Sequence, residues 1–274
     1  MAVGGCLFSR TPMALVRELL RQRRRGLTLA RNLTCTEGES LMVAGAVARI
    51  VTAWMSIGLP WGVSKILRHF VESGRVAFEE WSHLALGLRF RAAAMGVPFL
   101  PTLTMLGSDL MEVGGMKRLQ DPYTGATLAA VPALFPDVAM LHVHRADVFG
   151  NCQIDGYPHM DADIARAATT VLVTTEEIVG EEETRRRPER TVIPGFVVDA
   201  LVLAPLARSP TSATASTRRT STTSRTTPGR STRAGRTPWP ITSSATPTPL
   251  PRGATTSTSS AASGSRSSSA GRAS

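Results

Sequence analysis

The chain has 274 residues, 42% of them hydrophobic, and a formal net charge of +10. The last 67 residues, 208–274, hold ten of the 31 basic side chains and no acidic one, so residues 1–207 balance 21 basic against 21 acidic side chains. A neutral body excludes a nucleic-acid-binding domain with a positively charged folded face. Three widely spaced cysteines, Cys6, Cys35 and Cys152, exclude a disulfide-stapled secreted domain.

The sequence also bears on location. Met1 is followed by Ala-Val-Gly-Gly-Cys, which lacks the charged start and apolar core of a secretory signal. The apolar run 41–63 carries Arg49 near its middle together with Gly58 and Pro60, so we interpret it as a helix and a buried strand rather than as a membrane span. We therefore expect a cytoplasmic protein.

Helices and strands are expected to alternate through the first hundred residues. Hydrophobic periodicity predicts helices over 11–25, 39–48, 61–72 and 82–95 and strands over 27–32, 50–55 and 76–81. Thr11 and Pro12 fit the start of the first helix, and Ser82 fits the N-cap of the last.

The second half gives fewer signals. Residues 106–127 are expected to be irregular, 138–143 and 171–175 to be buried strands, and the acidic and arginine-rich segment 176–187 to be a solvated face. Alternating strands and helices predict an α/β fold, a parallel sheet with helices on both faces. Ligands bind beyond the carboxyl ends of such strands, which makes Gly4, Gly5, Asn32 and the Ser82–His83 junction candidate site positions.

The end of the sequence differs in composition from the rest. A mixture of Ser, Thr, Arg, Pro, Ala and Gly cannot bury enough apolar surface to offset chain entropy, so we expect a folded domain over 1–206 and a disordered tail over 207–274. Because 64 of the last 67 residues belong to these six types, which have GC-rich codons, translation in the wrong reading frame is a second explanation for the tail.

One cluster has the residue types of a metal site. His142 and His144 lie two apart and would share one face of a strand, with Asp147 after them and His159, Asp161 and Asp163 further on. A metal-dependent hydrolase built on His142, His144 and Asp147 is therefore an alternative. The favoured interpretation is a strand end whose polar side chains bond to loop backbone, and we expect no metal.

Several motifs taken together resemble the alpha subunit of class I CoA-transferases, in the branch of the glutaconate CoA-transferase A-subunit. The resemblance covers essentially residues 2 to 206. It rests on Val3-Gly4-Gly5 with Arg10-Thr11-Pro12, Leu27-Thr28-Leu29-Ala30-Arg31-Asn32, the segment 89–101, Leu106-Gly107-Ser108-Asp109, Asp121-Pro122-Tyr123-Thr124-Gly125, the segment 142–147, Gly150-Asn151 and the segment 193–200.

The resemblance implies that the chain has the NagB/RpiA-like fold of CoA-transferases. It also implies that the chain is only one of the two subunits that form the enzyme. In two-subunit members a glutamate of the beta chain, in a Ser-Glu-Asn-Gly-like motif that this sequence lacks, attacks the acyl-CoA carbonyl and carries CoA as a glutamyl-CoA thioester. It also implies coenzyme A as a substrate with no permanently bound cofactor, and a beta-subunit partner in an α2β2 or larger hetero-oligomer. A CoA-dependent hydrolase on the same fold is the alternative.

The same resemblance assigns candidate site residues. Gly4 and Gly5 would form the CoA- and acyl-binding loop, Asn32 would donate to the oxyanion, and His83 would occupy a position where 3-oxoacid CoA-transferases carry a glutamine. The alternatives are a tight turn for the glycines, a strand-end turn residue for Asn32 and a helix-start residue without catalytic duty for His83.

Both edges of the domain depart from the family pattern. Family members have some 20 to 30 residues before the glycine loop and an aromatic-rich segment after Ala204-Pro205, so the sequence predicts a truncated start and a foreign tail. A third hypothesis is therefore a protein that is not an enzyme, either a scaffold subunit or a defective gene product whose tail prevents assembly.

Overall fold

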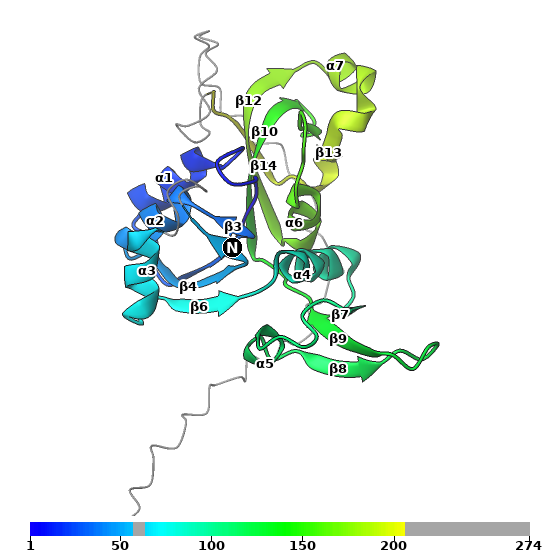
Figure 1. Ribbon diagram of the computed structural model, residues 1–274. Coiled ribbons are helices and arrows are strands. Elements are labelled where there is room, and N and C mark those ends of the chain that lie inside the picture. The colour runs from blue at the N-terminus through cyan, green and yellow to red at the C-terminus, as the bar shows by residue number, and fades with distance from the viewer. Residues whose placement is uncertain (57–63, 206–274) are drawn as a thin grey trace, which may run out of the picture. The chain divides into compact units, whose positions relative to one another are not determined.

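The computed structural model describes residues 1–56 and 64–205 and is built around one large, mainly parallel sheet (Figure 1). Each of the pairings along its main path is parallel. The strands follow the order β14 (Ala200–Leu203), β12 (Thr170–Val179), β10 (Val138–Asp147), β1 (Ala2–Val3), β2 (Leu27–Ala30), β4 (Val47–Thr52) and β6 (Ala77–Glu80). The predicted α/β fold with a parallel sheet is confirmed.

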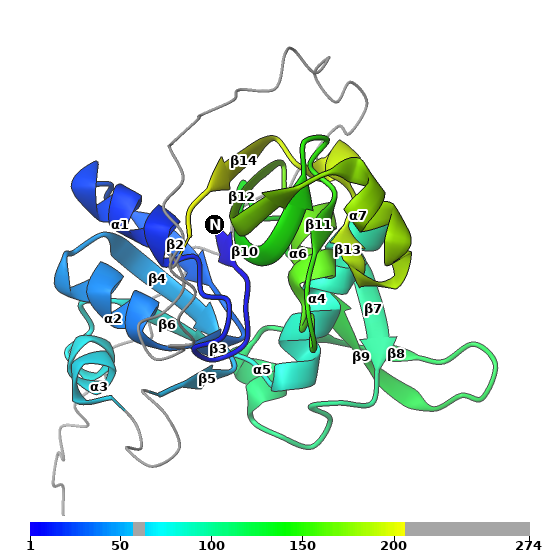
Figure 2. The same cartoon turned by 90° about the horizontal axis from the view of Figure 1, so that it is seen from above.

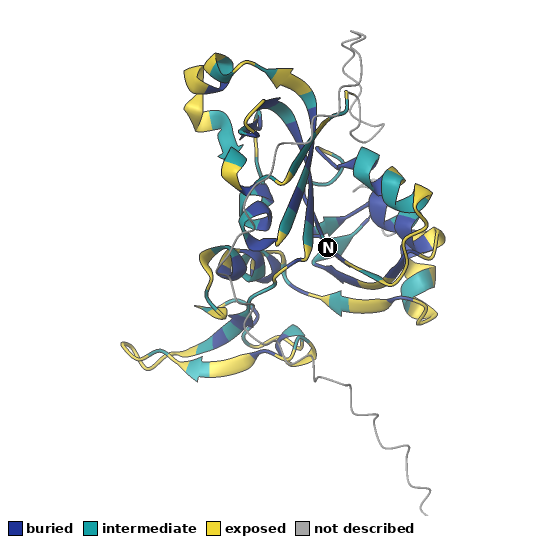
Figure 3. Cartoon of the chain, turned by 180° about the vertical axis from the view of Figure 1, so that it is seen from behind, coloured by how far each residue is buried: buried dark blue, intermediate teal, exposed yellow. Residues whose placement is uncertain are grey.

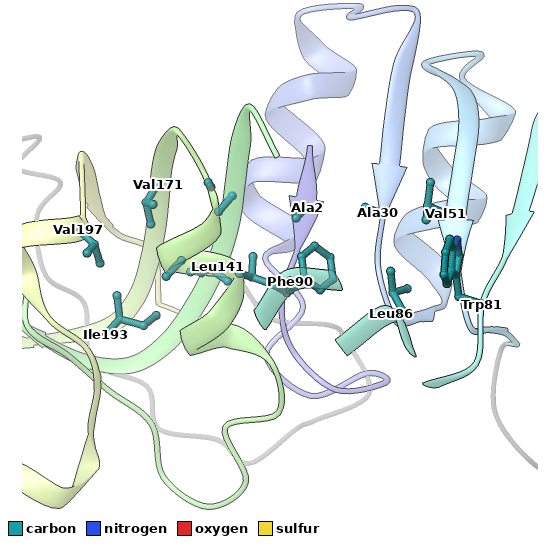
Figure 4. Close-up of a cluster of buried hydrophobic side chains, with 14 of the residues drawn as sticks. Ala2, Ala30, Val51, Trp81, Leu86, Phe90, Leu141, Val171, Ile193 and Val197 are labelled. Carbon is teal, nitrogen blue, oxygen red and sulfur yellow. The ribbon is translucent and has the colours of Figure 1, made fainter. Parts of the chain in front are cut away.

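Helices cover both faces of this sheet, as predicted. On one face lie α1 (Met13–Arg21), α2 (Thr36–Val43) and α3 (Lys65–Glu72), and on the other lie α4 (His83–Met95) and α6 (Asp161–Ala167) (Figure 2). Neighbouring strand residues alternate between the two cores because side chains of a strand point to opposite faces. Ala2, Ala30, Val51 and Leu141 join the α4 core shown in Figure 4, whereas Val3, Leu29, Ile50 and Met140 join the other.

Helix 82–95 forms as its capping residues predict. Ser82 Oγ accepts a hydrogen bond from the backbone N–H of Ala85 at 3.1 Å, and Gly96 ends the helix in the left-handed region with φ +74°. The predicted helix 61–72 begins at Lys65 behind the N-cap Ser64, and its first residues, 61–63, lie outside the described residues, as does the tail 207–274.

Two predicted helices end earlier than their periodicity indicates. Gly45 has φ +64°, and the bonds from Gly45 N to Met42 O and from Ala46 N to Leu41 O form a Schellman motif that stops α2 at Val43. Arg23, with φ +52°, does the same for α1, which ends at Arg21 rather than at Arg25. Because α2 ends early, the strand that follows it, β4, begins at Val47 and not at residue 50 as predicted.

The expectation that 106–127 is irregular is wrong. This segment contains α5 (Leu110–Val113) and β8 (Lys117–Gln120), and β8 pairs with β9 (Thr127–Pro132), which pairs with β7 (Phe99–Thr102) in an antiparallel sheet. Many side chains of this small sheet are exposed (Figure 3), and β8, with three of its four residues exposed, lacks the apolar alternation that signals a half-buried strand.

The remaining elements are short. β3 (Leu33–Thr34) pairs with β5 (Trp54–Met55), and β11 (Cys152–Gln153) joins β10 to β13 (Thr191–Ile193) in antiparallel pairs. β12 continues to Val179, so the acidic segment begins inside a strand and continues in α7 (Glu181–Arg186). Two 3-10 helices, Pro188–Arg190 and Gly195–Val197, complete the described chain, in which no helix is long and apolar enough to cross a membrane.

Candidate active site

The predicted glycine loop and Asn32 lie at the same edge of the sheet. Gly4 and Gly5 directly follow β1, and Asn32 comes two residues after β2. Because β1 and β2 are parallel neighbours, with Ala2 paired to Ala30, their carboxyl ends meet. The topology therefore brings together residues that are almost thirty positions apart.

Glycine is required at both loop positions by close packing. The backbone N–H of Gly5 donates to Asp161 Oδ1 at 2.8 Å, and Gly5 has φ +83°. A Cβ at Gly5 would lie 2.5 Å from Ser9 O, and one at Gly4 would lie 2.7 Å from Asp161 Oδ1. The tight turn that is the alternative to a binding role is present, and it uses the Gly5 N–H inside the protein.

Two buried ion pairs hold this loop. Arg10 Nη2 lies 3.3 Å from Asp161 Oδ2, and Arg31 Nη1 lies 2.5 Å from Glu37 Oε2, with all four side chains at most 3% exposed. Arg31 Nη2 also donates to Leu7 O at 2.8 Å. Since each arginine faces one carboxylate, the charges cancel and the loop is fixed by groups of the chain itself.

Burial works against the ionised carboxylate of Asp161. Desolvation raises the pKa of Asp161, while Arg10, the N–H of Gly5 and Arg31 act in the opposite direction. The sequence pattern connects this residue only with a metal cluster, because its proximity to a loop 156 positions away has no signal in the sequence.

Asn32 is 2% exposed and faces α4 and α6. Its Nδ2 donates to the backbone oxygen of His83 at 2.9 Å and lies 2.9 Å from Met160 Sδ, while Oδ1 has no hydrogen-bond partner among the described residues. A thioether is a weak acceptor, so a substrate oxygen can replace the sulfur as partner of one amide hydrogen. The backbone oxygen of Asn32 accepts from Ala53 and Trp54, both at 3.1 Å, as expected of a turn residue at a strand end.

His83 is the first residue of α4 and has an aromatic neighbour that sequence reasoning missed. The ring centroids of His83 and His159 are 5.3 Å apart, and His159 lies 5.7 Å from Tyr157. Burial lowers the pKa of His159 to about 4, and the charges of His83, Arg10 and Arg31 contribute to the shift. His159 is therefore a neutral imidazole at pH 7.

The three thiols are poor nucleophiles in this structure. Burial raises the pKa of Cys6 above its usual value, raises that of Cys35 to about 12 and raises that of Cys152 further. A thiol acts as a nucleophile through its thiolate, which is scarce at neutral pH under these conditions.

The residues of the metal hypothesis serve the structure. His142 Nδ1 lies 2.9 Å from Thr174 Oγ1 and its Nε2 lies 3.0 Å from Glu176 Oε1. His144 Nδ1 accepts from the backbone N–H of Asp155 at 3.1 Å. Asp147 is fully buried and accepts from Asn151 Nδ2, Thr184 Oγ1 and the N–H groups of Phe149 and Asn151. In the part of the chain that the structure describes, no three His, Cys, Asp or Glu side chains are arranged to hold a metal ion.

Several curated proteins are similar to this chain in sequence. A protein from Archaeoglobus fulgidus is 44% identical over 211 residues, which are 77% of this chain and 47% of that protein. The A-subunit of glutaconate CoA-transferase from Acidaminococcus fermentans is 34% identical over 77% of this chain and 71% of its own length. A cholesterol ring-cleaving hydrolase IpdA subunit from Mycobacterium tuberculosis is 31% identical over 75% of this chain and 73% of its length. The chain thus spans about half of the first relative and under three quarters of the others.

Solved structures of proteins with similar sequences have the same fold as this chain. The crystal structure of glutaconate coenzyme A-transferase from Acidaminococcus fermentans aligns with a TM-score of 0.70 at 34% identity, over 75% of this chain and 70% of the other. That of the decarboxylase AibA/AibB aligns with a TM-score of 0.69 at 37% identity, over 77% and 78%. The coenzyme A transferase family model matches residues 1–204. With this match over most of its length and a parallel sheet like that of the solved relatives, the chain belongs to the coenzyme A transferase family, as a homologue of its A-subunits.

Proposed function

We propose that this chain is the alpha subunit of a two-subunit enzyme that moves coenzyme A between an acyl-CoA and a carboxylic acid. A glutamate carboxylate of the beta chain attacks the thioester carbonyl, which releases the CoA thiolate and leaves a mixed anhydride. The thiolate attacks the glutamyl carbonyl of the anhydride, so the donor acid departs as a carboxylate and glutamyl-CoA remains. An acceptor carboxylate then attacks glutamyl-CoA, and the two steps run in reverse to give the new acyl-CoA.

The observation that carries this proposal is the state of the carboxylates at the glycine loop. Asp161 and Glu37 are fully buried and paired with Arg10 and Arg31, so neither is free to attack a thioester. The nearby thiol of Cys6 has a raised pKa and is a weak nucleophile as well. The site of this chain thus provides hydrogen-bonding groups, but its own carboxylates are already paired. This arrangement is consistent with an enzyme whose nucleophile comes from a second chain.

The role we assign to this chain is to bind and polarise the acyl group. Asn32 would turn one amide hydrogen from Met160 to the carbonyl oxygen, where negative charge develops during attack. His83 would add a hydrogen bond from the start of α4, next to the same amide. Gly4 and Gly5 keep the backbone close enough for coenzyme A to pass over the loop, in a hetero-oligomer of α2β2 or larger composition.

A CoA-dependent hydrolase is the second candidate, because one relative of 31% identity is named as part of a hydrolase. The two activities differ in the final acceptor, which is a carboxylate for a transferase and water for a hydrolase. The same chain and the same partner glutamate would serve either reaction.

Co-expression of this chain with a candidate beta subunit, one that carries a Ser-Glu-Asn-Gly-like motif, would test the proposal. We expect the purified complex to exchange CoA between acetyl-CoA and free carboxylic acids, and mass spectrometry to find CoA bound to a glutamate of the beta chain. Hydrolysis of acetyl-CoA with no exchange would identify the hydrolase. Neither exchange nor a CoA adduct, with a panel of short acyl-CoA donors, would contradict the proposal.

A further inference from the structure

Three side chains connect the end of β6 to the second turn of α4. Trp81 and Ser82 link the two elements, and His83 is the first residue of the helix. Glu79 Oε1 accepts from Trp81 Nε1 at 2.8 Å and from Arg89 Nη1 at 2.6 Å. The Arg89 guanidinium also lies 4.2 Å from the centroid of the Trp81 ring. These contacts close the β6–α4 corner, which comprises residues 79–83.

The Arg89 guanidinium is held at this corner by three kinds of contact at once. Besides the carboxylate and the indole ring, it bonds through Nε to the backbone oxygen of Pro132, the last residue of β9, at 3.3 Å. Trp81 is 2% exposed and belongs to the α4 core (Figure 4), and the Arg89 side chain is 11% exposed. An ion pair that is shielded from water is less screened than one on the surface, so this pair fixes the geometry of the corner.

The corner in turn holds the amide of Asn32. Asn32 Nδ2 donates to the backbone oxygen of His83, while its other contact is the weakly accepting sulfur of Met160. Oδ1 finds no partner within residues 1–56 and 64–205. The orientation of the amide therefore depends on one strong hydrogen bond, which it makes to the first residue of α4. A catalytic donor has to be held within about 0.5 Å and 10–20° of its productive position.

The backbone of Asn32 is connected to the same corner through β4. The backbone N–H of Trp81 donates to Thr52 O at 3.0 Å, and Thr52 Oγ1 lies 3.3 Å from Asn32 O. The corner thus reaches Asn32 twice, through α4 at its side chain and through the last residue of β4 at its backbone.

We propose that Arg89 is a positioning residue for the proposed reaction and acts through the Asn32 amide. By joining Glu79 and Trp81 to α4, its guanidinium fixes the start of the helix, whose first backbone oxygen orients that amide toward the acyl carbonyl. This inference rests on the proposed function for its effect on turnover. Its effect on the amide itself can be measured in the full chain without any substrate.

Selective labelling makes the Asn32 amide visible. Asn32 and Asn151 are the only asparagines in the sequence, so 15N-asparagine gives two side-chain amides in an NMR spectrum. Arg89→Met keeps the length of the side chain and removes the charged fork, while Glu79 retains Arg49 at 3.3 Å. We expect the Asn32 amide signals to shift and its hydrogens to exchange with water about tenfold faster, as expected when one hydrogen bond is weakened. The Asn151 signals should stay unchanged.

Arg145→Met is the matched control for loss of an ion pair. Arg145 Nη2 lies 2.6 Å from Asp155 Oδ1, the same distance as in the Arg89 pair, and Asp155 likewise retains a second arginine, Arg190. This variant should leave the Asn32 signals in place. Arg89→Lys, which keeps the charge but not the planar fork, should show a smaller change at Asn32 than Arg89→Met.

A double-mutant cycle tests whether the effect on turnover passes through Asn32. In the complex with the beta chain, Arg89→Met should lower kcat about tenfold with KM nearly unchanged, because a misdirected donor loses part of the 10²–10³ that its removal costs. Added to Asn32→Ala, the same substitution should cost little more, since the donor it positions is gone.

The outcomes separate a positioning role from a structural one. Losses of kcat that multiply in the double variant, an Asn32 amide unchanged in Arg89→Met, or an equal change in Arg145→Met would each overturn the inference. If the wild-type complex transfers no CoA, the proposed function fails while the NMR experiment still tests Arg89. If the complex transfers CoA and Arg89→Met leaves kcat unchanged, only the inference fails.

Discussion

Replacement of Glu37 by alanine gives the sharpest test of how the loop is held. Glu37 is fully buried, its Oε2 lies 2.5 Å from Arg31 Nη1, and its Oε1 accepts from the backbone N–H of Cys35 at 2.8 Å. The substitution leaves a buried guanidinium without its counter-charge, which costs about 3–5 kcal/mol. Against a total stability of about 5–15 kcal/mol, this is a large share.

Urea unfolding followed by circular dichroism would measure the loss. With a slope of about 2–3 kcal/mol per molar urea, the midpoint should fall by about 1–2.5 M. Glu72→Ala is the matched control, because Glu72 pairs with Arg68 on the surface at 3.7 Å with both side chains more than half exposed. Its midpoint should stay nearly unchanged. A shift for Glu37→Ala no larger than that of the control would refute the reasoning that the buried pair stabilises the loop.

Three further predictions concern the same site. His159 has a folded pKa of about 4, below the unfolded value of about 6.5, so its contribution to stability is complete above pH 6.5 and is lost as pH falls toward 4. Unfolding free energies measured from pH 7.5 to 4 should decline less steeply for His159→Gln, and identical slopes would contradict this. Gly5→Ala should destabilise the chain by about 1–3 kcal/mol, because φ +83° and the contact with Ser9 O both disfavour a side chain; a melting temperature equal to that of wild type would count against it. Asn32→Ala in the complex should lower kcat about 10²–10³-fold with assembly intact. Steady-state kinetics and size-exclusion chromatography check this, and unchanged turnover would exclude an oxyanion role for Asn32.

Local signals in the sequence are enough to predict five strands of the large sheet and four of its covering helices, but not the short strands β1 and β14 or the helix α6. Ser82 and Gly96 mark the ends of α4 with side-chain and backbone chemistry that acts within a few residues. The early end of α1 escapes prediction because Arg23, like any non-glycine residue, gives little warning of a positive φ, whereas the end of α2 is marked in the sequence by Gly45. In the small antiparallel sheet, β8 escapes because three of its four residues are exposed, which leaves no apolar alternation, although β9 buries Ala129 and Val131.

The sequence predicts only those site residues that directly follow a strand. Gly4, Gly5 and Asn32 follow from their positions after strands, since parallel strands bring their carboxyl ends to one edge. The contacts of Asp161 with Gly5 and of His159 with His83 span 156 and 76 positions. No spacing rule links such residues, so only the folded chain reveals that α6 and the segment before it complete the site.

The position of β1 also has a consequence for the order of folding. This strand of two residues lies between β2 and β10, and its pairing of Ala2 with Ala139 joins the two ends of a very long chain segment. The sheet formed by β2, β4 and β6 can assemble from neighbouring segments and β1 can pair with β2 at its edge, but the pairing of β1 with β10 must wait until β10 has emerged from the ribosome. Contacts this distant in sequence slow folding. We expect newly made chains to pass through a stage in which residues 27–80 are ordered and the glycine loop is still open to proteases.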